Sequence, residues 1–124
     1  MNASAAPDDD LRLDNVQAQM RKGVLDYCIL LVIARGKQVY ASDILATLKS
    51  SNLLVVEGTV YPLLSRLNRA AYLTYTWVES SAGPPRKYYS LTPRGREALR
   101  QMTEQWVAFT TSINDLAKGS GETP

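Results

Sequence analysis

The other elements of this chain are arranged around the segment Glu57-Gly58-Thr59-Val60-Tyr61-Pro62-Leu63-Leu64-Ser65-Arg66-Leu67. Its periodicity predicts a helix that runs to about Ala70 or Ala71, with one apolar stripe made by Val60, Leu63, Leu64 and Leu67. The remaining face is small, hydroxyl-rich and basic, as a helix that enters a DNA groove requires. Every amphipathic surface helix has a polar side, however, so the neighbouring segments must decide what this face does.

A β-hairpin is predicted directly after this helix. Residues 73–79 alternate and are rich in β-branched and aromatic side chains, which is typical of a strand. The composition of residues 80–85 predicts a loop, and residues 86–91 return as a second strand. A structural hairpin does not need the Arg86-Lys87 pair at its base, whereas a wing that lies along a phosphate backbone uses one.

A shorter helix is predicted before residues 57–67. It runs from about Asp43 to Ser50, with Ser42 as its N-cap, and Val39-Tyr40 ahead of it predicts a very short strand or extended link. A short helix joined by a turn to an amphipathic one, followed by a hairpin, is typical of a winged helix-turn-helix.

Two long helices flank this unit. The first, from about Asp14 to Arg35, is apolar on two faces, so it is either deeply buried or sandwiched between its own core and another subunit. Thr92 as N-cap and Pro93 at the first helical position predict the last helix, which runs to about Lys118. Because so long a helix would overhang a single small core, we expect its a/d seam to form a homodimer interface. The seam consists of Leu99, Met102, Trp106, Phe109, Ile113 and Leu116.

The expected fold class is therefore mainly α with a small β-hairpin, a winged helix-turn-helix with N- and C-terminal dimerisation helices. We expect residues 1–13 to be a disordered acidic arm and residues 119–124 a disordered tail. The winged domain and its dimerisation helices would span residues 14–118, of which 94–118 form the C-terminal helix.

Composition and charge exclude several classes of function. The net charge is only +2, but residues 57–100 hold seven basic against three acidic side chains, a modest basic patch. Cys28 is the only cysteine and histidine is absent, so the usual zinc and general-base sites are not available. We therefore expect no enzyme and no cofactor. The longest apolar run, residues 27–34, is too short for a membrane span, and no secretory signal is visible, so we expect a cytoplasmic protein.

Two motifs carry a family resemblance. The first is Gly58-Thr59-Val60-Tyr61-Pro62 with the later Leu64-x-x-Leu67, and the second is Gly83-Pro84-Pro85-Arg86-Lys87-Tyr88-Tyr89-Ser90-Leu91-Thr92-Pro93-Arg94-Gly95. Together with Gly23-Val24-Leu25-Asp26 before an Ile/Leu run, they resemble the PadR family of bacterial transcriptional regulators. The resemblance covers about residues 17–117 and is to the compact members, which lack a second helical domain.

The resemblance implies a homodimer that binds a palindromic double-stranded DNA operator, usually as a repressor. The helix that begins at Glu57 would enter the major groove, and the wing would touch the flanking phosphates or the minor groove. The implied DNA contacts are Thr59, Tyr61, Ser65 and Arg66 on this helix, Arg86 and Lys87 on the wing, and Ser42 and Lys49 on the preceding helix.

The chemistry of these side chains agrees with such roles, with alternatives for some of them. Arg66 suits bidentate hydrogen bonds to a guanine edge, and the hydroxyl groups suit phosphate or base contacts. The alternative to a DNA contact is packing against the wing for Tyr61 and exposure to solvent without a contact for Lys49. The chain departs from the family pattern at Ala41-Ser42, where Gly-Tyr is common, so either Ser42 or Tyr40 would take over the phosphate contact of that tyrosine.

A second implied function is sensing. In some compact family members the first and last helices of two subunits enclose a cavity for flat, hydrophobic ligands, with a paired tryptophan at its centre. An aromatic small-molecule effector would then change the spacing of the two recognition helices. The alternatives are a Trp106 that only fills the dimer seam and, for the whole chain, a winged-helix module for protein–protein contact. The residues that would line the cavity are Met20, Gly23, Tyr27, Thr103, Trp106 and Thr110.

Overall fold

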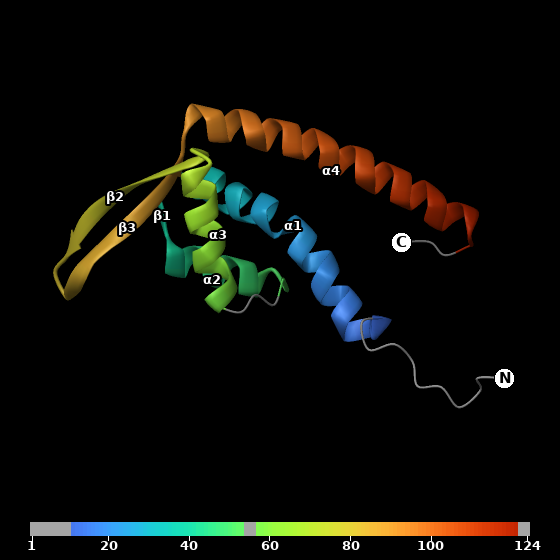
Figure 1. The fold of residues 1–124 in the computed structure, drawn as a ribbon, viewed down its shortest axis with the longest axis horizontal. Helices are drawn as coiled ribbons and strands as arrows, with labels where there is room; N and C mark the ends of the chain where they lie inside the picture. Colours follow the sequence, from blue (N-terminus) through green and yellow to red (C-terminus); the bar gives the residue numbers. More distant parts are fainter. Residues whose placement is uncertain (1–10, 54–56, 122–124) are drawn as a thin grey trace.

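The structure, a computed structural model, describes residues 11–53 and 57–121 and has a winged helix-turn-helix architecture (Figure 1). The prediction of a mainly helical chain with a small hairpin is confirmed. In chain order the elements are α1 (Leu13–Gly36), β1 (Val39–Tyr40), α2 (Ala41–Ser50), α3 (Glu57–Arg69), β2 (Leu73–Ser80), β3 (Gly83–Leu91) and α4 (Pro93–Gly119).

The hydrophobic core lies where α1, α2, α3 and the sheet meet. Most of the apolar stripe predicted for α3 is buried there, because Val60, Leu64 and Leu67 are at most 4% exposed. Leu63 is only partly buried and packs against the edge of the same core. The stripe therefore anchors α3 to the core, and the remaining faces of the helix are available for other contacts. The buried apolar residues are Leu25, Ile29, Leu30, Ile33, Val39, Ile44, Leu48, Val60, Leu64, Leu67, Leu73, Tyr89 and Leu91.

The three strands form an antiparallel sheet in the order β1-β3-β2. The short β1 pairs only with Tyr88 and Tyr89, so the outer half of the β2–β3 hairpin projects from the helical body as a wing (Figure 1). The loop predicted over residues 80–85 is wrong, since β3 already begins at Gly83. Pro84 and Pro85 are accommodated because β3 has one neighbouring strand there and the register is irregular between Val78 and Ser80.

The helix starts are set by local hydrogen bonds. The prediction that Ser42 caps α2 is wrong: Tyr40 is the N-cap, its backbone N–H donates to Asp43 Oδ2 at 3.3 Å, and Ser42 lies in the first turn. The predicted Thr92 cap of α4 is confirmed, because the Gly95 backbone N–H donates to Thr92 Oγ1 at 2.9 Å. Helix α1 begins at Leu13, one residue earlier than predicted.

Helix α4 is joined to the body at its first turn. Gly95 is buried against the backbone of Tyr72, and a Cβ atom at this position would collide with the Tyr72 carbonyl oxygen. The same carbonyl accepts a hydrogen bond from the Thr92 backbone N–H at 3.1 Å. This close approach fixes the direction in which α4 leaves the sheet.

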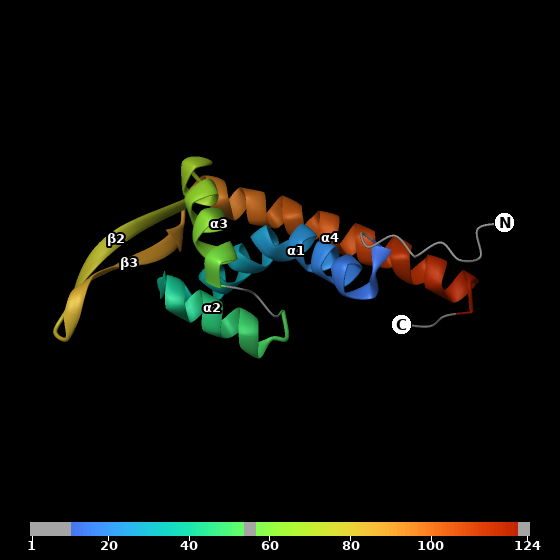
Figure 2. The same ribbon diagram turned by 60° about the horizontal axis from the view of Figure 1, so that its bottom comes forward.

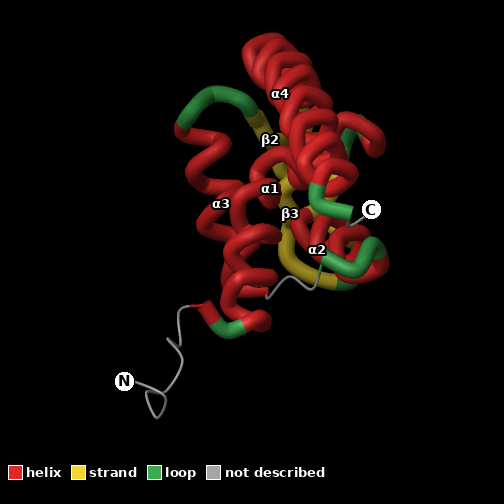
Figure 3. The backbone as a smooth tube through the Cα atoms, turned by 90° about the vertical axis from the view of Figure 1, so that its right-hand side faces the viewer, coloured by secondary structure: helices red, strands yellow, loops and turns green. Residues whose placement is uncertain are grey.

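The two long helices point away from the wing. Figure 2 shows α1 and α4 extending together to the side opposite the hairpin, and in the end-on view of Figure 3 α1 takes the central place with α2, α3 and α4 around it. Of the predicted arm and tail, residues 1–10 and 122–124 lie outside the described residues. Within the described ranges, no helix has the length and hydropathy that crossing a membrane requires.

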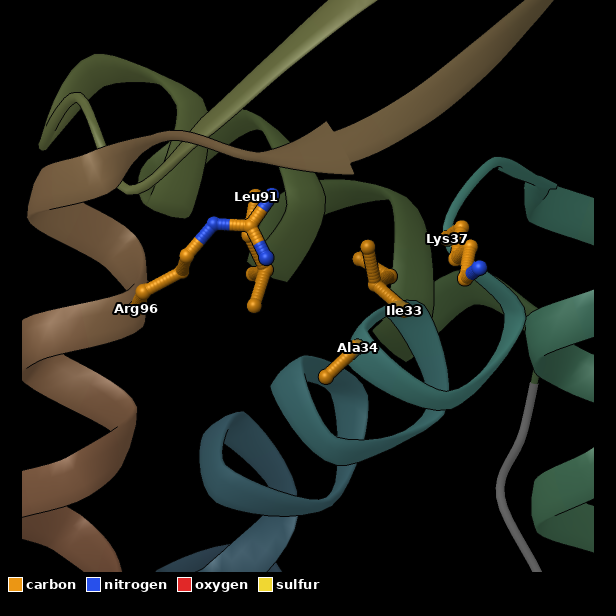
Figure 4. Close-up of a pocket in the computed structure, with 5 residues that line it drawn as sticks. All are labelled: Ile33, Ala34, Lys37, Leu91 and Arg96. Atoms are coloured by element: carbon orange, nitrogen blue, oxygen red, sulfur yellow. The ribbon is translucent and has the colours of Figure 1, made fainter.

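A small hollow of about 260 Å³ marks the junction of α1, β3 and α4 (Figure 4). Ile33, Ala34 and Leu91 supply its apolar side chains, and Lys37 and Arg96 approach from two ends. It shares no lining residue with the two clefts on the wing side of the molecule that are described below.

Candidate nucleic-acid interface

A surface cleft of about 490 Å³ opens between the start of α2, helix α3 and the wing. It brings together four of the eight side chains predicted to contact DNA: Ser42 from α2, Tyr61 from α3, and Arg86 and Lys87 from β3. Tyr61 is 48% exposed and shares the cleft with the wing residues Arg86 and Lys87. The complete lining is Tyr40, Ala41, Ser42, Tyr61, Trp77, Arg86, Lys87 and Tyr89.

Aromatic rings hold the two wing cations in place. Lys87 Nζ lies 4.4 Å from the ring centroid of Tyr75 and 5.3 Å from that of Trp77, and Arg86 Cζ lies 5.2 Å from the ring centroid of Tyr40. Cation–π contacts orient a cation without neutralising it. Within the described ranges neither cation forms an ion pair with a carboxylate, so both charges remain available to a phosphate.

Two phenols near the wing cations, Tyr89 in the cleft and its neighbour Tyr88, have raised pKa values. The ring centroids of Tyr40 and Tyr88 are 3.7 Å apart, and the hydrogen bond between the two side chains raises the pKa of Tyr88. Burial raises the pKa of Tyr89. Because a raised pKa favours the neutral phenol, these two side chains do not offset the positive charge of Arg86 and Lys87.

A second, smaller cleft of about 200 Å³ continues the surface along α3. It contains Ser65, as predicted for a DNA contact, and Arg69, which was not among the predicted contacts. Arg69 follows Ser65 by one helical turn and faces the wing with it, so helical spacing is the signal that could have found it. Lys87 and Tyr89 line both clefts, which makes the two clefts one continuous surface between α3 and the wing.

Three predicted contacts lie apart from both clefts. Thr59 is exposed near the start of α3, and Lys49 is exposed at the opposite end of α2 from Ser42. Arg66 is turned toward α1, where its Nη2 donates to Asp26 Oδ2 at 2.7 Å. The side chain predicted to read a guanine is therefore engaged within the protein.

The residues predicted for an effector site come together only in part. The Tyr27 hydroxyl donates to Thr103 Oγ1 at 3.0 Å, and the ring centroids of Tyr27 and Trp106 are 6.2 Å apart. Thr110 donates its hydroxyl to the Trp106 and Val107 carbonyl oxygens of its own helix. Met20 is 70% exposed, and Gly23 is also exposed on α1.

The a/d seam of α4 divides into two parts. Leu99 and Met102 pack against the core of their own chain. The later positions are open to solvent in the single chain, and their exposure increases toward the C-terminus: 42% at Trp106, 56% at Phe109, 60% at Ile113 and 74% at Leu116.

Known proteins share both the sequence pattern and the fold. The model of the transcriptional regulator PadR-like family matches residues 29–101. A PadR-like transcription factor from Bacteroides fragilis is 50% identical, with a TM-score of 0.69 over 84% of this chain and all of the other. A PadR-like transcriptional regulator from Bacillus cereus is 38% identical, with a TM-score of 0.70 over 79% of this chain and 95% of the other.

A more distant structure shares the fold. It is PadR from Bacillus subtilis in complex with operator DNA, which is 24% identical and has a TM-score of 0.59 over 64% of this chain and 46% of the other. Motifs, fold and family model thus agree. The chain belongs to the PadR-like family of transcriptional regulators, which are transcription factors and not enzymes.

Proposed function

We propose that this chain binds operator DNA as a homodimeric repressor, with α3 in the major groove and the β2–β3 wing on the flanking phosphates. The observation that carries the proposal is the continuous surface between α3 and the wing. It presents Arg86 and Lys87 as oriented cations without acidic partners among the described residues, beside the exposed hydroxyls of Ser42, Tyr61 and Ser65. The Bacillus subtilis PadR complex with operator DNA has the same fold and supports this assignment.

The individual roles follow from side-chain chemistry. Arg86 and Lys87 contribute charge to phosphate contacts, and the hydroxyl groups of Thr59, Tyr61 and Ser65 donate to phosphates or base edges. Ser42 replaces the phosphate contact expected from the family tyrosine, and Lys49 is a weaker, more distant contact. Arg69 joins this set because it shares a cleft with Ser65 and Lys87.

The exposed seam of α4 supports the proposal that the chain pairs with a second copy. Four large apolar side chains on one helix face remain in water in the single chain, which soluble proteins avoid unless the face is an interface. Pairing this face with its copy would remove these four side chains from water. The proposed domain, the winged helix-turn-helix with its dimerisation helices, spans residues 14–118.

The proposed function is tested by a mobility-shift titration with the DNA upstream of the protein's own coding sequence. We expect a discrete shifted band at low salt that resists an excess of random DNA, and repression of a reporter driven by that DNA. Absence of any shift at low salt, where phosphate contacts are strongest, would favour a protein–protein module instead.

We also propose that a planar aromatic molecule binds between the α1 and α4 helices of the dimer and releases the protein from DNA. The supporting observation is the group of Tyr27, Thr103 and Trp106 at the edge of the exposed seam. In a Trp77→Phe background Trp106 is the only tryptophan, so its fluorescence reports this site alone. We expect quenching by members of a panel of planar aromatic compounds; no quenching by any of them assigns Trp106 to the dimer core.

A further inference from the structure

Arg66 has a partner that its predicted contact with DNA does not explain. Its guanidinium reaches from α3 to α1 and forms an ion pair with Asp26, 40 positions earlier in the chain, with an Nη2–Oδ2 distance of 2.7 Å. The Arg66 side chain is 59% exposed and the Asp26 side chain 38%. The other Asp26 oxygen, Oδ1, is buried without a hydrogen-bond partner among the described residues. Arg66 is thus the group that compensates a partly desolvated carboxylate.

The position of Arg66 on α3 separates it from the side chains around the wing. Ser65 and Arg69 share a cleft with the wing residue Lys87, whereas Arg66 lies on the flank that faces α1. The backbone of α3 approaches mainly α2 and β2, and no comparable run of backbone contacts joins it to α1 in the described part of the chain. The ion pair is therefore a direct polar connection between these two helices.

We infer that Arg66 is a positioning residue: its ion pair with Asp26 fixes the orientation of the recognition helix α3 on helix α1. This inference rests on the proposed function, since it concerns how α3 is held for DNA binding. It replaces the prediction that Arg66 reads a guanine edge.

The ion pair also connects α3 to the proposed effector site. Asp26 is followed directly by Tyr27, whose hydroxyl donates to Thr103 and whose ring lies beside Trp106. The ion pair therefore lies one residue along α1 from the side chains of the proposed effector site.

The test is a double-mutant cycle on operator binding by the full chain. We expect Asp26→Ala and Arg66→Ala each to lower operator affinity about threefold to tenfold, and the double variant to be no weaker than the weaker single variant. On operators with single base-pair changes, all variants should keep the preference of the unmodified protein. Asp26→Asn removes the charge but preserves the shape of the side chain. Thermal melting of each variant shows whether a loss of affinity comes from loss of the ion pair or from loss of folding.

An apolar replacement provides the matched control. Asp26→Leu with Arg66→Met keeps two side chains of similar size in contact, and we expect operator affinity within about threefold of the unmodified protein. A base-reading Arg66 predicts the opposite pattern: strong loss in every Arg66 variant, altered preference at one base pair, and unchanged or higher affinity for Asp26→Ala. That pattern, or additive losses in the cycle, would overturn the inference. If the unmodified protein binds no DNA, the proposed function itself has failed, which is a distinguishable result.

Discussion

Replacement of Phe109 and Ile113 by aspartate is expected to convert the dimer into a monomer and to lower operator affinity about 100-fold or more. Both side chains are more than half exposed in the single chain, at 56% and 60%, so the substitution does not disturb the core of one subunit. In the dimer it would bury four carboxylates in an apolar seam, which is strongly unfavourable. A monomer contacts one half-site and loses the gain in affinity from joining two.

The measurement is sedimentation or light scattering together with an operator titration. Ala108→Asp with Thr111→Asp adds the same charge to the other side of the helix, at two exposed positions, and serves as the matched control. We expect the control to remain dimeric and to bind within a few-fold of the unmodified protein. A Phe109/Ile113 variant that is still dimeric and still binds would contradict an α4 interface.

Replacement of Arg86 and Lys87 by alanine is expected to weaken binding to operator and random DNA alike, by about 100-fold near physiological salt. If each cation contacts one phosphate, a dimer loses four contacts. The slope of log affinity against log salt concentration should then fall by between three and four, since each contact contributes about 0.9. Preference among operator sequences should be retained, because phosphates carry no sequence information.

Two controls separate position from charge. Arg86→Lys with Lys87→Arg keeps both charges on the wing and should preserve most of the salt slope. Arg12→Ala with Lys118→Ala removes the same charge near the ends of α1 and α4, away from the wing, and should leave the slope unchanged (Figure 1). If removal of charge at either place has the same effect, the wing is not a DNA contact.

Local patterns were sufficient to predict most of the fold. The start of α4 depends on the Thr92 cap and on Pro93, which lacks an N–H, and both can be recognised within residues 92–95. The apolar spacing of α3 predicts its burial for the same reason. The loop at residues 80–85 was predicted wrongly because Pro84-Pro85 suggests a turn, and only the pairing of β3 with β2 shows that a strand with one neighbour tolerates them.

The candidate site could be predicted in its residue types but not in its contacts. The sequence indicates that Lys87 is a wing cation. Its position over the rings of Tyr75 and Trp77, however, depends on the strand register, which pairs Trp77 with Lys87. The ion pair of Arg66 with Asp26 joins two helices far apart in sequence, and no local pattern indicates it. Long-range polar contacts of this kind require the fold.

Hydroxyl-radical footprinting on the DNA upstream of the protein's own coding sequence shows whether a homodimer occupies an operator there. A homodimer with one α3 helix in each of two major-groove segments predicts two related protected half-sites about one helical turn, or about 10 base pairs, apart. It also predicts that flanking protection disappears when Arg86 and Lys87 are replaced by alanine. A single protected half-site, or uniform protection without sequence symmetry, would contradict operator binding by a homodimer.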